Sequence, residues 1–195
     1  SDRSDGGKLR YRPQPLPTAW CSATFAILIL CGLAWCWPEG DRERLRMTVL
    51  SVGPGSATVI ELPDGQTVLY DSGTSLPLDV GRSVVAPFLG HRGIRHLDQV
   101  YLSHPNLDHF SGLPTILDQV DADAVIINPC FEPKSSPRSP SRHLLALLSA
   151  GGQSLQVLDT STTTWEFGGV QFEWLWPRGE CSPSLSTNDT STVLR

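Results

Sequence analysis

Residues 103–112 read SHPNLDHFSG, and the features on either side of this stretch indicate the fold. The stretch follows DQVYLS (98–103), a run rich in β-branched and aromatic residues, and precedes a segment with helical spacing. Two imidazoles and one carboxylate fall between His104 and His109. Ligand-binding and catalytic groups often lie where a strand ends, on a loop held by a rigid sheet. The pattern therefore predicts a functional loop between a strand and a helix.

The side chains of this loop are those of a metal site. Histidine supplies a borderline nitrogen ligand and aspartate a hard oxygen ligand, a combination that suits zinc, manganese or iron. We therefore expect His104, Asp108 and His109 to bind a divalent cation. Taken singly, each residue has a simpler interpretation, because a histidine after a strand is usually a surface residue and Asp108 could cap the following helix. The joint pattern favours the metal site.

A further acidic residue, Asp71, closes the predicted strand TVLYD (67–71) and is followed by a Ser-Gly pair. If strands 67–71 and 98–103 are neighbours in one sheet, Asp71 and His104 lie at the same edge. Asp71 would then support the metal ligands from behind. The alternative is an ordinary turn former, because Asp-Ser-Gly is a common turn sequence.

The chain after residue 46 alternates between strand and helix signals. Short β-branched runs separated by Gly and Pro indicate strands, and apolar residues at helical spacing indicate helices. The expected strands are 47–52, 57–62, 67–71, 98–103, 123–128, 154–158, 163–167, 170–176 and 191–195. The expected helices are 79–89, ended by Gly90 and Gly93, 112–120 and 143–150, with loops at 133–142 and 177–190. This order predicts an α/β layered fold.

Charge and cysteine content restrict the function further. The formal net charge is −5, so no overall basic field would recruit nucleic acid, and a DNA substrate would need a local patch or a metal. Five cysteines are present without a Cys-x-x-Cys pair, which argues against a cysteine zinc site. Cys130 and Cys181 could form a disulfide in an oxidising compartment, but two free thiols are the preferred interpretation.

Residues 18–37 read TAWCSATFAILILCGLAWCW, about the 20 apolar residues that span a bilayer as a helix. Trp20 lies at one end and Trp35 and Trp37 at the other, where indole rings favour the membrane interface. A cleaved signal peptide would need small residues where Trp35 and Trp37 stand. We therefore predict a transmembrane helix, whose orientation stays open because basic residues flank both ends.

The predicted membrane helix divides the chain into four parts. A polar segment (1–17) precedes the helix, a charged linker (38–46) follows it, and residues 47–195 form one domain. The first residue is not methionine, and Arg195 falls within an expected strand. We therefore expect the chain to be part of a longer protein, with its domain truncated at the C-terminal end.

HPNLDH (104–109) resembles the His-x-His-x-Asp-His signature of the metallo-β-lactamase superfamily, and more narrowly the His-x-Asp-x-Asp-His of ComEC-type competence proteins. SVGPGSATVIELPDGQTVLYDSG (51–73) is similar to the opening segment of that subfamily and its Tyr-Asp-x-Gly strand end. Residues 84–109 resemble its helix, strand and metal loop, and residues 188–195 resemble its later Asn-x-x-Ser-Val-Leu strand. The resemblance runs in order over about residues 17–195, and an upstream hydrophobic span agrees with it.

The resemblance implies a metallo-β-lactamase-like αββα sandwich, of which this chain holds an incomplete N-terminal portion. It implies a two-metal Zn or Mn site with His104 on the first metal and Asp108 and His109 on the second. Asn106 would be a further ligand, and Asp108 the catalytic residue. The implied activity is that of a nuclease or phosphodiesterase acting on single-stranded DNA during DNA uptake. The implied location is the inner (plasma) membrane, with other DNA-uptake proteins as partners.

The chain departs from the subfamily pattern at the metal loop and in the opening segment. Asn106 replaces an expected acid or histidine, and its neutral amide attracts a divalent cation less than a carboxylate would. The family's later ligands would lie beyond Arg195, so this chain alone would not complete the site. The remaining departures are Ser51, Pro54, Ser56 and Ser111.

Two alternatives to a nuclease stay open. One is a catalytically degenerate, membrane-tethered scaffold that keeps the fold and has lost the metal, which Asn106 favours and the acid–histidine set opposes. The other is a different hydrolase of the superfamily, such as a lactonase or a thioesterase.

Overall fold

The computed structural model describes residues 25, 27–31, 44–131, 138–159, 161–178, 181–182 and 184–195. The chain divides into two compact units, residues 1–40 and residues 41–195. Most of the predicted polar segment, membrane helix and linker lies outside the described residues. Residues 25 and 27–31 are helical, and their side chains are exposed. Within the described ranges, no helix combines the length and the apolarity that a membrane crossing needs.

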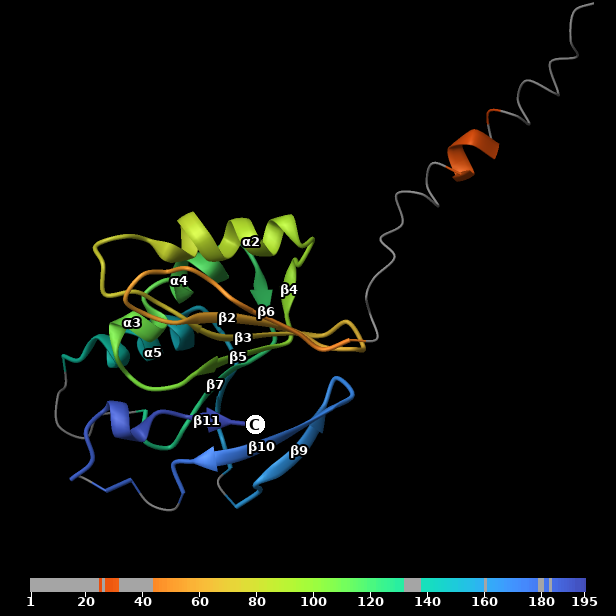
Figure 1. The fold of residues 1–195 in the computed structure, drawn as a ribbon. Coiled ribbons are helices and arrows are strands. Elements are labelled where there is room, and N and C mark those ends of the chain that lie inside the picture. Colours follow the sequence, from red (N-terminus) through yellow and green to blue (C-terminus); the bar gives the residue numbers. More distant parts are fainter. Residues whose placement is uncertain are drawn as a thin grey trace, which may run out of the picture. The chain divides into compact units, whose positions relative to one another are not determined.

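The second unit is built around a six-stranded mixed sheet (Figure 1). β1, β2 and β3 pair antiparallel, whereas β3, β5, β7 and β8 are parallel. Antiparallel neighbours can be joined by short turns, but parallel neighbours need a crossover, which here contains helices. In spatial order the strands are β1 (Arg46–Val49), β2 (Ala57–Glu61), β3 (Thr67–Ser72), β5 (Gln99–Leu102), β7 (Val125–Ile127) and β8 (Leu155–Val157).

Helices and a second sheet lie on opposite faces of the six-stranded sheet (Figure 1). The helical segments are η1 (Gly81–Val85), α2 (Ala86–His91), α3 (Leu107–Phe110), α4 (Leu113–Leu117) and α5 (Pro140–Ala150). The second sheet has the order β11-β10-β9, from β9 (Thr164–Phe167), β10 (Val170–Trp176) and β11 (Val193–Leu194). A short pair, β4 (His96–Leu97) with β6 (Asp121–Ala122), and the 3-10 turn η2 (Asn188–Thr190) complete the described elements.

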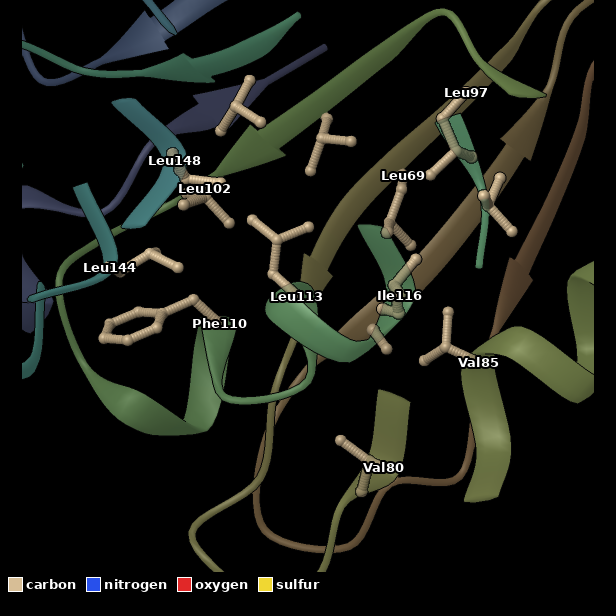
Figure 2. Packing of buried hydrophobic residues seen from close by; sticks show 14 of the residues in the cluster. Leu69, Val80, Val85, Leu97, Leu102, Phe110, Leu113, Ile116, Leu144 and Leu148 are labelled. Atoms are coloured by element: carbon tan, nitrogen blue, oxygen red, sulfur yellow. The ribbon is translucent and has the colours of Figure 1, made fainter. Parts of the chain in front are cut away.

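Two apolar cores hold these layers together, because successive residues of a strand point to opposite faces. In β3, Leu69 packs under the helices while Val68 packs between the two sheets, where Tyr101 of β5 joins it. Figure 2 shows Leu69 on the same side as Leu113 and Ile116 of α4. Helix layer, sheet and second sheet are three consecutive layers of the predicted αββα sandwich, so the α/β fold class is confirmed.

The start of α5 corrects the predicted loop at 133–142. The helix begins at Pro140, because the Ser139 hydroxyl accepts a hydrogen bond from the backbone N–H of Arg142 at 3.3 Å. Serine is a favoured N-cap residue, and proline fits the first helical position because its missing N–H would be unpaired there.

The helix predicted at 79–89 also differs from the structure. It begins as the π-helical turn at Gly81 and continues past Gly90 to His91. An exposed helical glycine costs only about 1 kcal/mol, so Gly90 does not end the helix. Gly93, with φ of 71°, ends it, because glycine adopts this left-handed conformation readily.

Cys130 and Cys181 form a disulfide, so the interpretation as two free thiols was wrong. Their Cα atoms lie 5.4 Å apart although 51 positions separate them in sequence. They meet because the end of the chain returns to the β5–β7 edge, where the N–H of Thr192 bonds to the carbonyl of Ser103 at 2.8 Å. Sequence spacing alone does not contain this tertiary contact.

The disulfide predicts a redox-dependent stability. Replacing both Cys130 and Cys181 by Ser should lower the free energy of unfolding by about 2–4 kcal/mol, because the unfolded chain regains loop entropy. Denaturant unfolding measures the change, and peptide mapping without reductant should identify the bond directly. Cys31→Ser is the matched control, because Cys31 is an exposed free thiol. Recovery of Cys130 and Cys181 as free thiols in the oxidised protein would contradict the pairing.

Candidate metal centre

The carboxyl ends of β3 and β5 bring Asp71 and His104 to one edge of the sheet. These strands are parallel neighbours, with Tyr70 opposite Tyr101, so the chain leaves both strands at the same edge. The two strands are therefore neighbours, as the prediction for Asp71 and His104 required.

The loop after β5 gathers three of the predicted ligands. His104, Asp108 and His109 each offer one ligand atom, and these atoms all lie within 4.8 Å of one another. The two imidazole rings have centroids 3.8 Å apart, and Nε2 of His109 lies 3.7 Å from Oδ2 of Asp108. The single helical turn α3 creates this arrangement by carrying Asp108 and His109 on adjacent positions. Asp108 makes no capping hydrogen bond, and the N-cap residue is Asn106.

Asp71 supports the loop through hydrogen bonds of its carboxylate. This residue is buried, with only 1% of its surface exposed. One carboxylate oxygen accepts the backbone N–H of Ser103 at 2.8 Å. The other oxygen accepts the Ser103 hydroxyl at 2.8 Å and lies 2.7 Å from Nδ1 of His109. Asp71 has a φ of 57°, a strained value for a residue other than glycine, which the three bonds stabilise. Since a carboxylate accepts, His109 donates through Nδ1 and keeps the lone pair of Nε2 for a cation.

His104 has the same tautomer, for a different reason. Its Nδ1 lies 3.0 Å from the hydroxyl oxygens of both Ser103 and Ser191. Each hydroxyl proton is already used, since Ser103 donates to Asp71 and Ser191 donates to the backbone carbonyl of Asn188 at 2.8 Å. Both serines therefore accept, and Nδ1 of His104 must be the donor. Nε2 of His104 is left as a lone-pair donor.

The pKa values of the two histidines shift in opposite directions. Burial lowers the pKa of His104, and the neighbouring His109 lowers it further, against the opposing charges of Asp71 and Asp108. Burial also lowers the pKa of His109, but the hydrogen bond and charge of Asp71, with the charge of Asp108, outweigh burial and raise this pKa above its ordinary value. Protonation of both neighbouring imidazoles is therefore unfavourable, because the two positive charges would repel each other.

Close backbone contacts fix the loop against the opening segment of the domain. A Cβ atom at Gly73 would lie 2.5 Å from the carbonyl oxygen of Leu107 and from the N of Phe110. At Gly55 it would lie 2.2 Å from the carbonyl oxygen of Gly73. These distances are far below van der Waals contact, so both positions require glycine. The glycines let the segment around residue 55 pack directly on the turn that carries the ligands.

Asn106 and two residues from the far end of the chain complete the site. Nδ2 of Asn106 donates to Oδ1 of Asn188 at 2.8 Å, and Ser191 contacts His104. The sequence indicated residues 188–195 only as a strand segment, and it did not indicate that Asn188 and Ser191 face the ligands. Their spacing from the loop, more than 80 positions, gives no local signal of the contact.

The donor set fits a divalent metal. One ligand atom from each of two imidazoles and from one partly exposed carboxylate lie within 4.8 Å of one another, and hydrogen bonds orient both imidazoles through Nδ1. Such outer hydrogen bonds are typical of metal-binding histidines. Asn106, in contrast to the other three, points its amide at Asn188.

Comparison with known proteins gives a family match and a structural likeness. The model of the metallo-beta-lactamase superfamily matches residues 50–129, which include Asp71 and the loop with His104, Asp108 and His109. Among solved structures, a metallo-beta-lactamase from Cronobacter sakazakii, a HARLDQ motif mutant, gives a TM-score of 0.42 at 18% identity, covering 65% of this chain and 49% of that one.

Three curated proteins are similar in sequence. Uncharacterized protein YcaI of Escherichia coli K12 is 36% identical over 96 residues, 47% of this chain and 12% of that protein. Recombination protein 2 of Haemophilus influenzae is 27% identical over 79% of this chain and 17% of its own length. Competence protein ComA of Neisseria gonorrhoeae is 25% identical over 92% of this chain and 22% of its own length. The chain thus spans less than a quarter of each relative, and the predicted resemblance to ComEC-type proteins is confirmed.

The hydrogen bonds of Asp71 predict a large effect of a small substitution. Asp71→Asn keeps the shape of the side chain but removes the charge that binds Ser103 and His109, so the free energy of unfolding should fall by about 2 kcal/mol. Chemical denaturation of the metal-free protein measures it. Asp118→Asn, at an exposed aspartate on the end of α4, should change stability by less than about 0.5 kcal/mol. Equal stability of the two variants would exclude a supporting role for Asp71.

Proposed function

We propose that the chain is the metal-dependent hydrolase part of a ComEC-type DNA-uptake protein and cleaves phosphodiester bonds of single-stranded DNA. One observation carries the proposal: ligand atoms of His104, Asp108 and His109 lie within 4.8 Å of one another, and hydrogen bonds at Nδ1 orient both imidazoles. The match to the metallo-beta-lactamase superfamily supports the hydrolase class. The relatives named Recombination protein 2 and Competence protein ComA support DNA as the substrate class.

The chemistry follows from the positions of the side chains. His104, Asp108 and His109 would hold a divalent metal, Zn or Mn, and a longer chain could add ligands for a second metal. When bound, the metal supplies Lewis acidity that polarises a phosphoryl oxygen and activates a water nucleophile. The Asp108 side chain is partly exposed, and its carboxylate would accept a hydrogen bond from that water and orient it toward phosphorus. Attack by the water oxygen would form a new P–O bond and break the P–O bond to the leaving group, and the proton that the water gives to Asp108 would pass to the alkoxide.

The location and partners belong to the same proposal. Residues 18–37 would anchor the domain in the inner (plasma) membrane as a transmembrane helix, as their length and tryptophans indicate. The net charge of −5 offers DNA no general attraction, so the phosphate would be bound locally by the metal centre. Other DNA-uptake proteins would be the partners of the whole protein.

A second candidate function is a scaffold that has lost catalysis. The neutral Asn106 favours it, because an amide attracts a divalent cation less strongly than the carboxylate of the subfamily pattern. A lactonase or thioesterase of the same superfamily would use the same ligands on another ester. Substrate panels separate the three functions, since a scaffold hydrolyses none of these substrates.

The neutral amide leads to a measurable prediction. Asn106→Asp adds one negative charge at the ligand cluster, so the affinity of the intact protein for Mn²⁺ should rise by about tenfold, or about 1.4 kcal/mol. Isothermal titration calorimetry measures it at fixed ionic strength. Gln156→Glu is the matched control, because it adds the same charge at an exposed position of the edge strand β8 and should leave the affinity unchanged. An unchanged affinity in Asn106→Asp would show that residue 106 lies outside the metal's reach.

The activity itself is tested on the intact protein. With Mn²⁺ or Zn²⁺ present, it should cleave single-stranded DNA, and His109→Ala should reduce the rate by at least about a hundredfold, because the ligand and its bond to Asp71 are both lost. Gel electrophoresis of labelled oligonucleotides follows the cleavage. His143→Ala, at an exposed histidine of α5, is the control and should keep full activity. Equal activity of the two variants would reject the role given to His109.

A further inference from the structure

Asn188 is the residue that distinguishes this site from a plain histidine–aspartate cluster. It opens the turn η2 and reaches across to the metal loop, where its Oδ1 accepts a hydrogen bond from Nδ2 of Asn106 at 2.8 Å. This amide oxygen therefore contacts the loop of the candidate ligands, although it comes from a turn more than 80 positions away in sequence.

The contact matters because an amide has two chemically different ends. A carboxylate at position 106, as in the subfamily pattern, would present an oxygen to a cation in either orientation. Asparagine presents an oxygen in one orientation and an NH₂ group, which repels a cation, in the other. The rotation that exchanges the ends barely changes the shape of the side chain, so packing alone selects neither. A hydrogen-bonding partner must make the choice.

Asn188 can make this choice. By accepting from Nδ2, its oxygen fixes which end of the Asn106 amide is the donor, and Oδ1 of Asn106 accepts no hydrogen bond from the described residues. The backbone of Asn188 is itself held, because its carbonyl accepts the Ser191 hydroxyl at 2.8 Å and the Ser191 N–H at 3.1 Å. The turn is anchored further by Asn128, whose Nδ2 donates to the carbonyl of Thr190 at 3.0 Å.

We propose that Asn188 is a positioning residue that orients the amide of Asn106, so that Oδ1 of Asn106 is the atom offered to the metal. The proposal rests on the metal site proposed above. It gives this chain a means of using an uncharged residue where the subfamily pattern has an acid. In this role Asn188 acts through Asn106, and its effect depends on residue 106 being an amide.

A metal-independent measurement tests the orientation first. In the metal-free intact protein, exchange of the Asn106 side-chain NH₂ protons with solvent should be slowed, and Asn188→Ala should accelerate it to the rate of an exposed asparagine. Asn188→Asp keeps an acceptor oxygen and should retain the slow exchange. Thr187→Ala, at the exposed neighbouring residue, is the matched control and should change nothing. Fast exchange in the natural sequence, or no effect of Asn188→Ala, would overturn the proposal.

A double-mutant cycle on Mn²⁺ affinity tests the consequence. Asn188→Ala should weaken Mn²⁺ binding about tenfold in the natural sequence, in the range typical of residues that orient a ligand. In the Asn106→Asp background, whose carboxylate needs no orientation, the same substitution should change affinity by less than about threefold. Equal losses in both backgrounds would overturn the proposal, because Asn188 would then act independently of the amide.

The two measurements keep the proposals separable. Slowed NH₂ exchange that depends on Asn188, together with no Mn²⁺ binding in the natural sequence or in Asn106→Asp, would reject the metal-dependent function and with it the ligand role of Asn106. Mn²⁺ binding that depends on His109 but not on Asn188 would leave the proposed function standing and reject the positioning role alone.

Discussion

The structure of the site depends on one buried carboxylate. Asp71, the penultimate residue of β3, has a strained left-handed conformation and is bonded to the end of β5 through Ser103 and to the ligand turn through His109. A buried charge without partners would be costly, so these bonds are needed both to offset the burial of the carboxylate and to hold its backbone. The same three bonds join two strands and fix the tautomer of a candidate metal ligand. The hydrogen bonds of Asp71 therefore serve both the fold and the candidate metal site.

Backbone packing and the returning chain complete what Asp71 begins. Gly55 and Gly73 allow main-chain atoms to approach the ligand turn where a side chain could not fit. From the other side, Asn128 bonds to the carbonyls of Ser103 and Thr190, and thereby ties the end of β5 to the turn that bears Asn188. The disulfide between Cys130 and Cys181 links the segment just after Asn128 to the chain that precedes this turn. The ligand loop is thus held by contacts with separate segments of the chain.

The candidate functions differ in how they treat Asn106. A hydrolase would gain a further metal ligand from the uncharged amide of Asn106, and the hydrogen bond to Asn188 would hold that amide in one orientation. A scaffold requires only that the loop remain folded, and the hydrogen bonds of Asp71 support the loop without any contribution from Asn106. The contact between two asparagines is therefore the part of the molecule in which the two functions make different physical demands, while the fold is common to both.

Local patterns determined much of this protein. The alternation of β-branched runs and turns located the strands, and the joint occurrence of His104, Asp108 and His109 after a strand indicated the ligand loop, because strand ends and ligand chemistry are encoded in neighbouring residues. Only the tertiary structure decided that Cys130 meets Cys181, that Ser191 sets the tautomer of His104 and that Asn188 bonds to Asn106. These contacts join segments 51 to 87 positions apart, and their geometry arises from sheet order and chain return, which no local periodicity records.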